Sequence, residues 1–301
     1  MPVSPSVANQ SGRWVRSYHL VELLGSGSFG AVYRANTLSC PVAVKLSEHE
    51  QMMKDESQIL LKLQGTPGVP QWLWFGKDQS HYCLAMSMGF KSLHDLRCLN
   101  KTTDYSFSDI TIQRILFQIT TVLEAIHSKG IVHRDVKPDN ILVTFPEGPD
   151  NRVSIIVGDF GLALQFKDED GTLEFPEHAP GVRRLFHSTP NGMMNIDHAP
   201  MDDFVMLTYA AIEMTNDCME QFHGKFQDKF KYKQELLRDP ELYMPASLYW
   251  LRHFFELVGQ QDDLLPVEYE QLRLSLNNSL PNSEASGPLL LTNEDGTWKL
   301  Y

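Results

Sequence analysis

Short apolar stretches separated by turn residues fill the first third of the chain. Apolar and polar positions alternate around a glycine cluster over 17–33, which predicts a β-hairpin. A further short strand is predicted over 41–46, and apolar residues at helical spacing predict a helix over 51–63. Strands are again predicted over 72–75 and 82–88. This part of the chain should therefore fold as a sheet with one helix.

After residue 90 the apolar positions follow helical spacing. The strongest helix is predicted over 111–128, where apolar residues recur at steps of three and four and Gly130 ends the pattern. A β-branched stretch over 153–157 predicts a strand, and later helices are predicted over 203–214, 246–258 and 269–276. This order predicts an α+β chain with a small β-rich lobe and a large α-helical lobe.

Composition narrows the class of protein. The 301 residues are 42% hydrophobic and 21% charged, which is typical of a globular chain long enough to bury a large core. Lysine and arginine number 26 against 38 aspartate and glutamate residues, a formal charge of −12. This balance argues against nucleic acid or a membrane surface as a partner, because both attract positive charge.

Cysteine usage and the N-terminal pattern indicate an intracellular location. The four cysteines form no Cys-x-x-Cys pair, so neither a zinc knuckle nor a redox dithiol is predicted. Residues 1–12 lack the apolar stretch of a signal peptide, and no run approaches the ~20 apolar residues that span a bilayer. We expect a soluble protein of the cytoplasm or the nucleus, with residues 1–16 as a frayed lead-in.

A glycine-rich stretch over 25–32 has the pattern Gly-x-Gly-x-x-Gly-x-Val. Glycines allow backbone amides to approach phosphates closely, and Val32 would cover a base. A dinucleotide-binding fingerprint has similar glycines but opens a helix, whereas Val32 and Tyr33 continue a strand. A glycine-rich hairpin without a ligand remains the alternative.

Lys45 ends the apolar strand that follows this hairpin. By itself such a lysine is usually a surface residue whose stem lies along apolar atoms. Next to the glycine-rich stretch, Lys45 would instead reach the α and β phosphates if a carboxylate held it. Glu56 is the expected partner because the apolar stripe of its helix lies beside it, and Glu50 is the rival.

The strongest motif is His-Arg-Asp-Val-Lys-Pro-Asp-Asn at 133–140, followed by Asp-Phe-Gly at 159–161. It matches the pattern of a phosphoryl-transfer catalytic loop. Asp135 would accept the proton of the attacking hydroxyl, and Asn140 and Asp159 would hold Mg²⁺ against the phosphates of ATP. Lys137 would place positive charge on the transferring phosphate.

These motifs resemble the eukaryotic protein kinase family over residues 18–278. Finer features are similar to the casein kinase 1 group: Gly-Thr-Pro-Gly-Val-Pro at 65–70, Ser-Leu-His-Asp-Leu at 92–96, His-Ser-Thr-Pro-Asn at 187–191, Asp-Asp-Phe at 202–204 and Pro-Val-Glu-Tyr-Glu-Gln-Leu at 266–272. Within that group the chain looks like the divergent, nematode-expanded branch, with distant similarity to tau-tubulin kinases and vaccinia-related kinases.

The resemblance implies the two-lobed protein-kinase fold, with a kinase domain over 17–285, lobes over 17–89 and 90–285, and a C-terminal tail over 286–301. It also implies Met86 as gatekeeper, 87–89 as hinge, and Asp203 as the carboxylate that braces the catalytic loop. The implied ATP-binding residues are Leu24, Gly25, Ser26, Gly27, Ser28, Phe29, Gly30, Ala31, Val32, Ala43, Lys45, Glu56, Met86, Met88 and Asp159.

The expected activity is transfer of the ATP γ-phosphate to serine or threonine of protein substrates, by a monomer that uses Mg²⁺. Lys137 favours serine or threonine over tyrosine by the family's pattern. Two alternatives stay open. A pseudokinase scaffold would keep the fold without turnover, although the residues that such chains usually lose are present. A small-molecule phosphotransferase would use an aspartate and an asparagine in the same catalytic roles.

Two departures from the family concern regulation and substrate. Where the casein kinase 1 group has an arginine that helps to hold a substrate phosphate, this chain has Phe186, with Arg183 and Arg184 just before it. We expect weaker dependence on phosphate-primed substrates, because an aromatic ring donates no charge-assisted hydrogen bond. Acidic residues over 168–180 are also candidates to pair with Arg134 in place of an activating phosphate.

Overall fold

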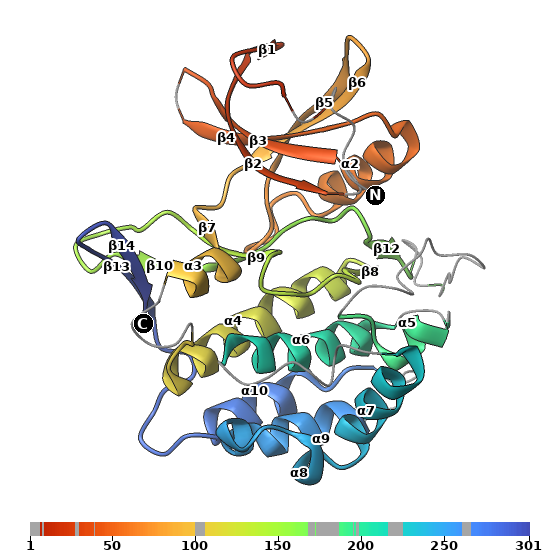
Figure 1. Cartoon of the computed structure of the whole chain (residues 1–301), viewed down its shortest axis with the longest axis vertical. Coiled ribbons are helices and arrows are strands. Elements are labelled where there is room, and N and C mark those ends of the chain that lie inside the picture. The colour runs from red at the N-terminus through yellow and green to blue at the C-terminus, as the bar shows by residue number, and fades with distance from the viewer. Residues whose placement is uncertain are drawn as a thin grey trace. The chain divides into compact units, whose positions relative to one another are not determined.

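The structure, a computed structural model, divides into two compact units, Met1–Gly89 and Phe90–Tyr301 (Figure 1). It describes residues 7, 9–27, 30–38, 40–99, 106–167, 172, 187–194, 196, 199–215, 225–260 and 266–301. Among the described residues, no helix combines the length and the apolar character needed to cross a membrane.

An antiparallel six-stranded sheet forms the first unit, in the order β1-β2-β3-β4-β6-β5. One helix, α2, connects β4 to β5 (Figure 1). The element bounds are β1 Trp14–Val15, β2 Tyr18–Gly27, β3 Gly30–Asn36, β4 Pro41–Ser47, α2 Glu50–Lys62, β5 Trp72–Asp78 and β6 His81–Ser87. The expected hairpin, strands and helix are all present, within a few residues of their predicted ends.

The period-two alternation of β3, β4 and β6 gives this sheet two different faces. One face is a buried apolar core, made of Val7, Val15, Tyr18, Leu20, Ala31, Tyr33, Ala35, Val42, Val44, Leu46, Cys83 and Ala85. Strand register places the intervening residues of β3, β4 and β6 on the opposite face, where Lys45 is paired with Val32 and Leu84, and Ala43 with Met86. The second face thus groups most of the predicted ATP-binding side chains of these strands.

The start of the chain differs from the expected frayed lead-in. Val7 is only 2% exposed and belongs to the core, and β1 pairs with the beginning of β2. Tyr33 explains the position of Val7: its ring is buried, and its hydroxyl donates a hydrogen bond to the Val7 carbonyl (2.7 Å). A buried tyrosine hydroxyl needs such a partner, so the sheet orders part of the preceding segment.

Helices dominate the second unit (Figure 1). They are α3 Leu93–Leu99, α4 Asp109–Ser128, α5 Pro190–Met194, α6 Pro200–Met214, α7 Phe226–Arg238, α8 Pro240–Tyr243, the 3₁₀ helix η3 Ala246–Leu251, α9 Arg252–Gln260 and α10 Tyr269–Asn277. The predicted helix over 246–258 is therefore a 3₁₀ turn followed by an α-helix, because Pro245 precedes it and the first turns close with i→i+3 bonds, Leu248 N to Pro245 O at 3.0 Å.

The centre of this unit is α6, which is buried on almost every side, with α4 packed beside it (Figure 1). The Ser108 side chain accepts a hydrogen bond from Thr111 N (3.2 Å), so α4 begins two residues before its predicted start. At α6 the Asp202 carboxylate accepts from Ala199 N (2.9 Å), which fixes the first turn. Both helices therefore have side-chain partners at their first turns.

Short strands complete the second unit: β7 Lys91–Ser92, β8 Ile131–Val132, β9 Ile141–Val143, β10 Arg152–Val153, β11 Ile155–Val157, β12 Leu164–Gln165, β13 Leu289–Glu294 and β14 Thr297–Leu300. The predicted strand over 153–157 is divided into β10 and β11, which join different sheets, β10 with β13 and β11 with β9. At the division, Thr144 N bonds to Ser154 O (2.9 Å).

The expected C-terminal tail over 286–301 is part of the second unit instead. Its strands β13 and β14 form a hairpin that pairs with β10 and contacts α3. Leu289, Leu291 and Leu300 are buried, and Trp298 meets Phe90 edge to face at 4.8 Å. The alternating apolar positions after Pro288 supply the buried face that holds this hairpin in place.

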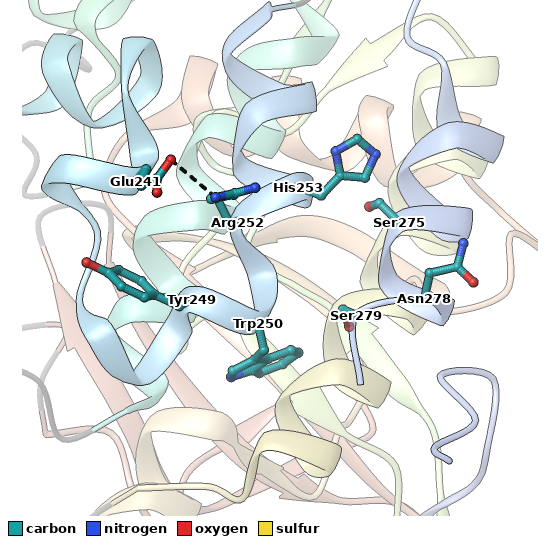
Figure 2. Close-up of a pocket in the computed structure, with 8 residues that line it drawn as sticks. All are labelled: Glu241, Tyr249, Trp250, Arg252, His253, Ser275, Asn278 and Ser279. Atoms are coloured by element: carbon teal, nitrogen blue, oxygen red, sulfur yellow. Dashed lines mark ion pairs between the residues drawn. The ribbon is translucent and has the colours of Figure 1, made fainter. Parts of the chain in front are cut away.

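Figure 2 shows a pocket of about 370 Å³ on the helical side of this unit. Side chains from α8, η3, α9 and α10 line it, and the Arg252–Glu241 ion pair (3.2 Å) crosses one side. Its residues are distant in sequence from the predicted catalytic loop.

Gly30 is the glycine on which the β2–β3 hairpin depends. Its φ is +136°, and an added Cβ would lie 2.2 Å from the Leu46 carbonyl oxygen of β4. We predict that Gly30→Ala lowers the free energy of unfolding by more than about 2 kcal/mol, through strain and clash together. In Gly27→Ala, the matched control, the added Cβ meets nothing within 4 Å, and a change within about 0.5 kcal/mol is expected. Denaturant unfolding of both variants measures this, and equal losses would contradict it.

Candidate active site

The catalytic-loop motif follows β8 in the second unit, and Asp203 near the start of α6 holds its backbone. Asp203 Oδ2 accepts a hydrogen bond from His133 N (2.8 Å) and Oδ1 accepts one from Arg134 N (2.8 Å). Arg134 has a φ of +69°, which is costly for a residue with a side chain. The two bonds to Asp203 thus fix a strained turn from which Asp135 projects.

The Asp203 carboxylate has no solvent exposure and is stabilised in its charged form. Burial by itself would raise its pKa, but the hydrogen bond and charge of His127, together with His133, outweigh burial and lower it. His127 Nε2 lies 2.9 Å from Asp203 Oδ2, and its Nδ1 lies 2.8 Å from the Tyr269 hydroxyl. The brace is therefore a buried chain that joins α4, α6 and α10.

Asp135, Lys137 and Asn140 form a compact cluster within the loop. Lys137 Nζ donates to Asp135 Oδ2 (2.7 Å), and Asn140 Nδ2 donates to the same oxygen (2.8 Å) and to the Asp135 carbonyl (2.8 Å). Asp135 is 4% exposed. Both side-chain bonds among the described residues use Oδ2, so Oδ1 remains for a further donor such as a substrate hydroxyl.

Asn140 and Asp159 lie at the same end of the β9–β11 hairpin. Ile141 pairs with Val157, and Gly158 N donates to the Asn140 carbonyl (2.8 Å). The Asp159 carboxylate is exposed, and its backbone has a φ of +59°. Because Asn140 uses its amide nitrogen on Asp135, its Oδ1 and the Asp159 carboxylate offer the hard oxygen ligands that Mg²⁺ prefers.

His133 connects the two halves of this cluster. Its Nδ1 accepts from Asp135 N (3.3 Å), and its Nε2 donates to the Gly158 carbonyl (2.9 Å). The ring also meets Phe160 at 4.9 Å in a T-shaped contact. These bonds require the tautomer protonated at Nε2, and they hold Asp159 and Asp135 in a fixed relation.

In the first unit Lys45 pairs with Glu56. Lys45 Nζ lies 2.8 Å from Glu56 Oε2 and 3.1 Å from Oε1, and the two side chains are 5% and 3% exposed. Glu50, the rival partner, is exposed on α2 and binds Lys54 and the Tyr82 hydroxyl. Glu56 is therefore the partner of Lys45.

The glycines of the glycine-rich hairpin differ in whether the structure leaves room for a side chain. An added Cβ at Gly25 or Gly27 meets no atom within 4 Å, whereas Gly30 cannot accept one. Leu24, beside them, is 47% exposed. Among the described residues of this unit, no contact requires glycine at Gly25 or Gly27, and the backbone there is open to close approach by a ligand.

The other predicted ATP-binding residues of the first unit lie in different parts of it. Val32, Ala43 and Met86 share the sheet face of Lys45, while the Ala31 side chain lies in the core on the opposite face. The expected hinge ends at the boundary between the compact units, where Met88 and Gly89 are partly exposed. Ser26 pairs with Ala31 in the hairpin.

Some predicted residues lie outside the described part of the chain. They are Ser28 and Phe29 of the glycine-rich stretch, the acidic residues Asp168, Glu169, Asp170, Glu174 and Glu177, and Arg183, Arg184 and Phe186.

Sequence reasoning missed His127 and Tyr269. His127 occupies a position of α4 that faces Asp203, and Tyr269 begins α10. A histidine beside an apolar helical stripe is the only sequence signal for this contact, and it does not identify the partner.

We predict that Asp203→Asn lowers the free energy of unfolding at pH 7 by about 2 kcal/mol or more, because it removes a buried charge from two backbone amides and His127. The lowered pKa fixes the pH dependence. Stability from the wild-type carboxylate is fully present above its ordinary pKa of 3.8 and is lost as the pH falls through the lower folded-state value.

Denaturant titrations from pH 7 to pH 3 should therefore show a constant difference between wild type and Asp203→Asn at neutral pH that shrinks in acid. Asp150→Asn, which removes an exposed carboxylate, is the control and should show little difference at any pH. A difference that grows in acid would refute the assignment.

Comparisons with known proteins identify the family of this chain. Residues 18–178 match the protein kinase domain family, and this range includes both the Lys45–Glu56 pair and the catalytic loop. Casein kinase I homolog 2 of Saccharomyces cerevisiae is 35% identical over 159 residues, which cover 50% of this chain and 28% of that relative. The chain thus matches less than a third of the relative's length. Because the family match extends over more than half of the chain, the chain belongs to the protein kinase domain family.

Proposed function

We propose that this chain is a casein kinase 1-like protein kinase that transfers the ATP γ-phosphate to serine or threonine of protein substrates. The observation that carries the proposal is the cluster of Asp135, Lys137 and Asn140 on a loop braced by Asp203. A scaffold without turnover does not require this arrangement of a base, a cation and an amide.

In this proposal Asp135 is the general base. Its Oδ1 accepts a hydrogen bond from the substrate hydroxyl and takes the proton as the hydroxyl oxygen bonds to the γ-phosphorus and ADP leaves. Lys137, bonded to Oδ2 of the proposed base, would place its charge on the transferring phosphoryl group. Positioning and electrostatics supply the rate enhancement, with no covalent intermediate on the protein.

Asn140 and Asp159 would hold Mg²⁺, and their shared place at the end of the β9–β11 hairpin supports this. When bound, the ion neutralises the charge of the phosphates and orients them. In the first unit, the open backbone at Gly25 and Gly27 would contact phosphate oxygens, and Val32, Ala43 and Met86 would pack on the base.

Lys45 would bind the α and β phosphates, with Glu56 holding its ammonium in place. Both side chains are almost completely buried, so each offsets the cost of burying the other's charge. The proposal also includes a preference for serine and threonine, a weaker dependence on phosphate-primed substrates than is usual in the casein kinase 1 group, and action as a monomer. Lys137 supports the acceptor preference through the resemblance to the casein kinase 1 group.

The test of the proposed function is a comparison of three proteins in one assay. Wild type should phosphorylate a serine peptide with Mg²⁺ and ATP, and Asp135→Asn should lower kcat by about 10²–10⁴-fold while ATP affinity is retained, because ATP does not need the base. Asp159→Asn should lose both transfer and Mg²⁺-dependent ATP binding, because one ligand of the ion loses its charge.

Circular dichroism of each variant establishes that it is folded. An Asp135→Asn protein that matches the wild-type rate would rule out this mechanism. Wild type that binds Mg-ATP without transferring phosphate would favour the scaffold alternative.

The Lys45–Glu56 pair generates a separate prediction. Lys45→Met and Glu56→Gln should each lower kcat/KM for ATP, and the double variant should lose little more than the worse single one, because the two residues act as one unit. Glu50→Gln is the matched control, since Glu50 lies on the same helix and forms an exposed pair with Lys54. Additive losses in the cycle would mean that Glu56 does not act through Lys45.

A further inference from the structure

Three potential metal ligands from separate parts of the second unit lie close together, and none of them has a role in the proposed mechanism. His94 comes from α3, Asp139 from the catalytic loop and Glu213 from α6, and their ligand atoms all lie within 4.8 Å of one another. His94 N also donates to the Pro138 carbonyl (3.2 Å), so the backbone places His94 beside Asp139. The cluster therefore has fixed positions for at least two of its members.

His94 Nδ1 is the unusual atom of this cluster. It is buried and has no hydrogen-bond partner among the described residues, although the side chain is 40% exposed overall. Glu213 Oε1 lies 3.8 Å away, which is too long for a hydrogen bond. A cation between the two atoms would satisfy both. His94 Nε2 faces Cys98 Sγ at 3.6 Å, so the second ring nitrogen already has a neighbour.

Glu213 is oriented by groups behind it, as metal-binding carboxylates commonly are. His187 Nε2 lies 3.0 Å from Glu213 Oε2, and the Arg97 guanidinium donates to the Glu213 carbonyl. Burial would raise the pKa of Glu213, but His187, Arg97 and His94 outweigh burial and lower it, so the carboxylate is ionised at neutral pH. Arg97 also lies 3.6 Å from Oε1 and weakens the attraction for a cation.

We propose that His94 Nδ1, the Asp139 carboxylate and Glu213 Oε1 form a binding site for a divalent transition metal such as Zn²⁺. One nitrogen and two oxygens are an established ligand set for zinc, and ligands held at about 2.0–2.1 Å in tetrahedral geometry lie about 3.4 Å apart. The 3.8 Å between His94 and Glu213 is close to that spacing. The Asp139 carboxylate is exposed and lies within 4.8 Å of the other two ligand atoms, and solvent would supply the fourth ligand.

The test is a Zn²⁺ titration of the metal-free full chain against a chromophoric chelator. An Asp159→Asn background removes the other candidate cation site, so the readout does not depend on kinase activity. We expect one Zn²⁺ per chain, and His94→Ala and Asp139→Asn should each weaken binding by at least about tenfold. His253→Ala is the matched control, because His253 lies 3.4 Å from a glutamate, Glu256, but the described part of the chain supplies no third ligand there. This variant should bind Zn²⁺ like the background protein.

A thermal-unfolding measurement gives an independent readout. Zn²⁺ should raise the Tm of the background protein and of His253→Ala, but not that of His94→Ala, because only a metal bound to the folded chain stabilises it. Equal Zn²⁺ affinity in the background protein, His94→Ala and Asp139→Asn would overturn the proposal, as would the absence of one tightly bound Zn²⁺.

Discussion

The buried carboxylate of Asp203 holds the backbone on which the catalytic loop depends. It accepts both amides of a turn that contains a residue at positive φ, and it remains charged because His127 and His133 outweigh the cost of burial. Asp135 follows this turn directly, and His133 connects it to Gly158, next to Asp159. The positions of the proposed base and of a proposed metal ligand thus depend on one buried charge near the start of α6.

In the first unit, a single sheet separates the residues that form the core from those of the proposed ATP site. Its period-two alternation assigns one face to the apolar core and the other to Lys45 and the small and apolar residues around it. Glu56 on α2 then neutralises the lysine in a nearly dry environment. An isolated charge in that position would be strongly disfavoured, so the buried pair requires α2 to be packed against the sheet.

Local patterns predicted most elements because helical and strand periods are properties of short segments. The apolar stripe of its helix also favoured Glu56 over Glu50, and the structure pairs Glu56 with Lys45. Contacts that depend on the tertiary structure were not available from the sequence. Val7 was expected in a frayed segment, because the sequence does not show that the Tyr33 hydroxyl donates a hydrogen bond to the Val7 carbonyl. His127 was missed for the same reason, since its partner Asp203 is 76 residues away.

The most direct test of the proposed kinase activity is to locate the phosphate that the chain transfers. The purified full chain would be incubated with Mg²⁺ and γ-labelled ATP in the presence of a peptide library containing serine, threonine and tyrosine, and the modified positions would be identified by mass spectrometry. We expect labelled phosphate on serine and threonine and none on tyrosine. Binding of Mg-ATP without any labelled peptide would contradict it, because the braced loop would then have no catalytic role.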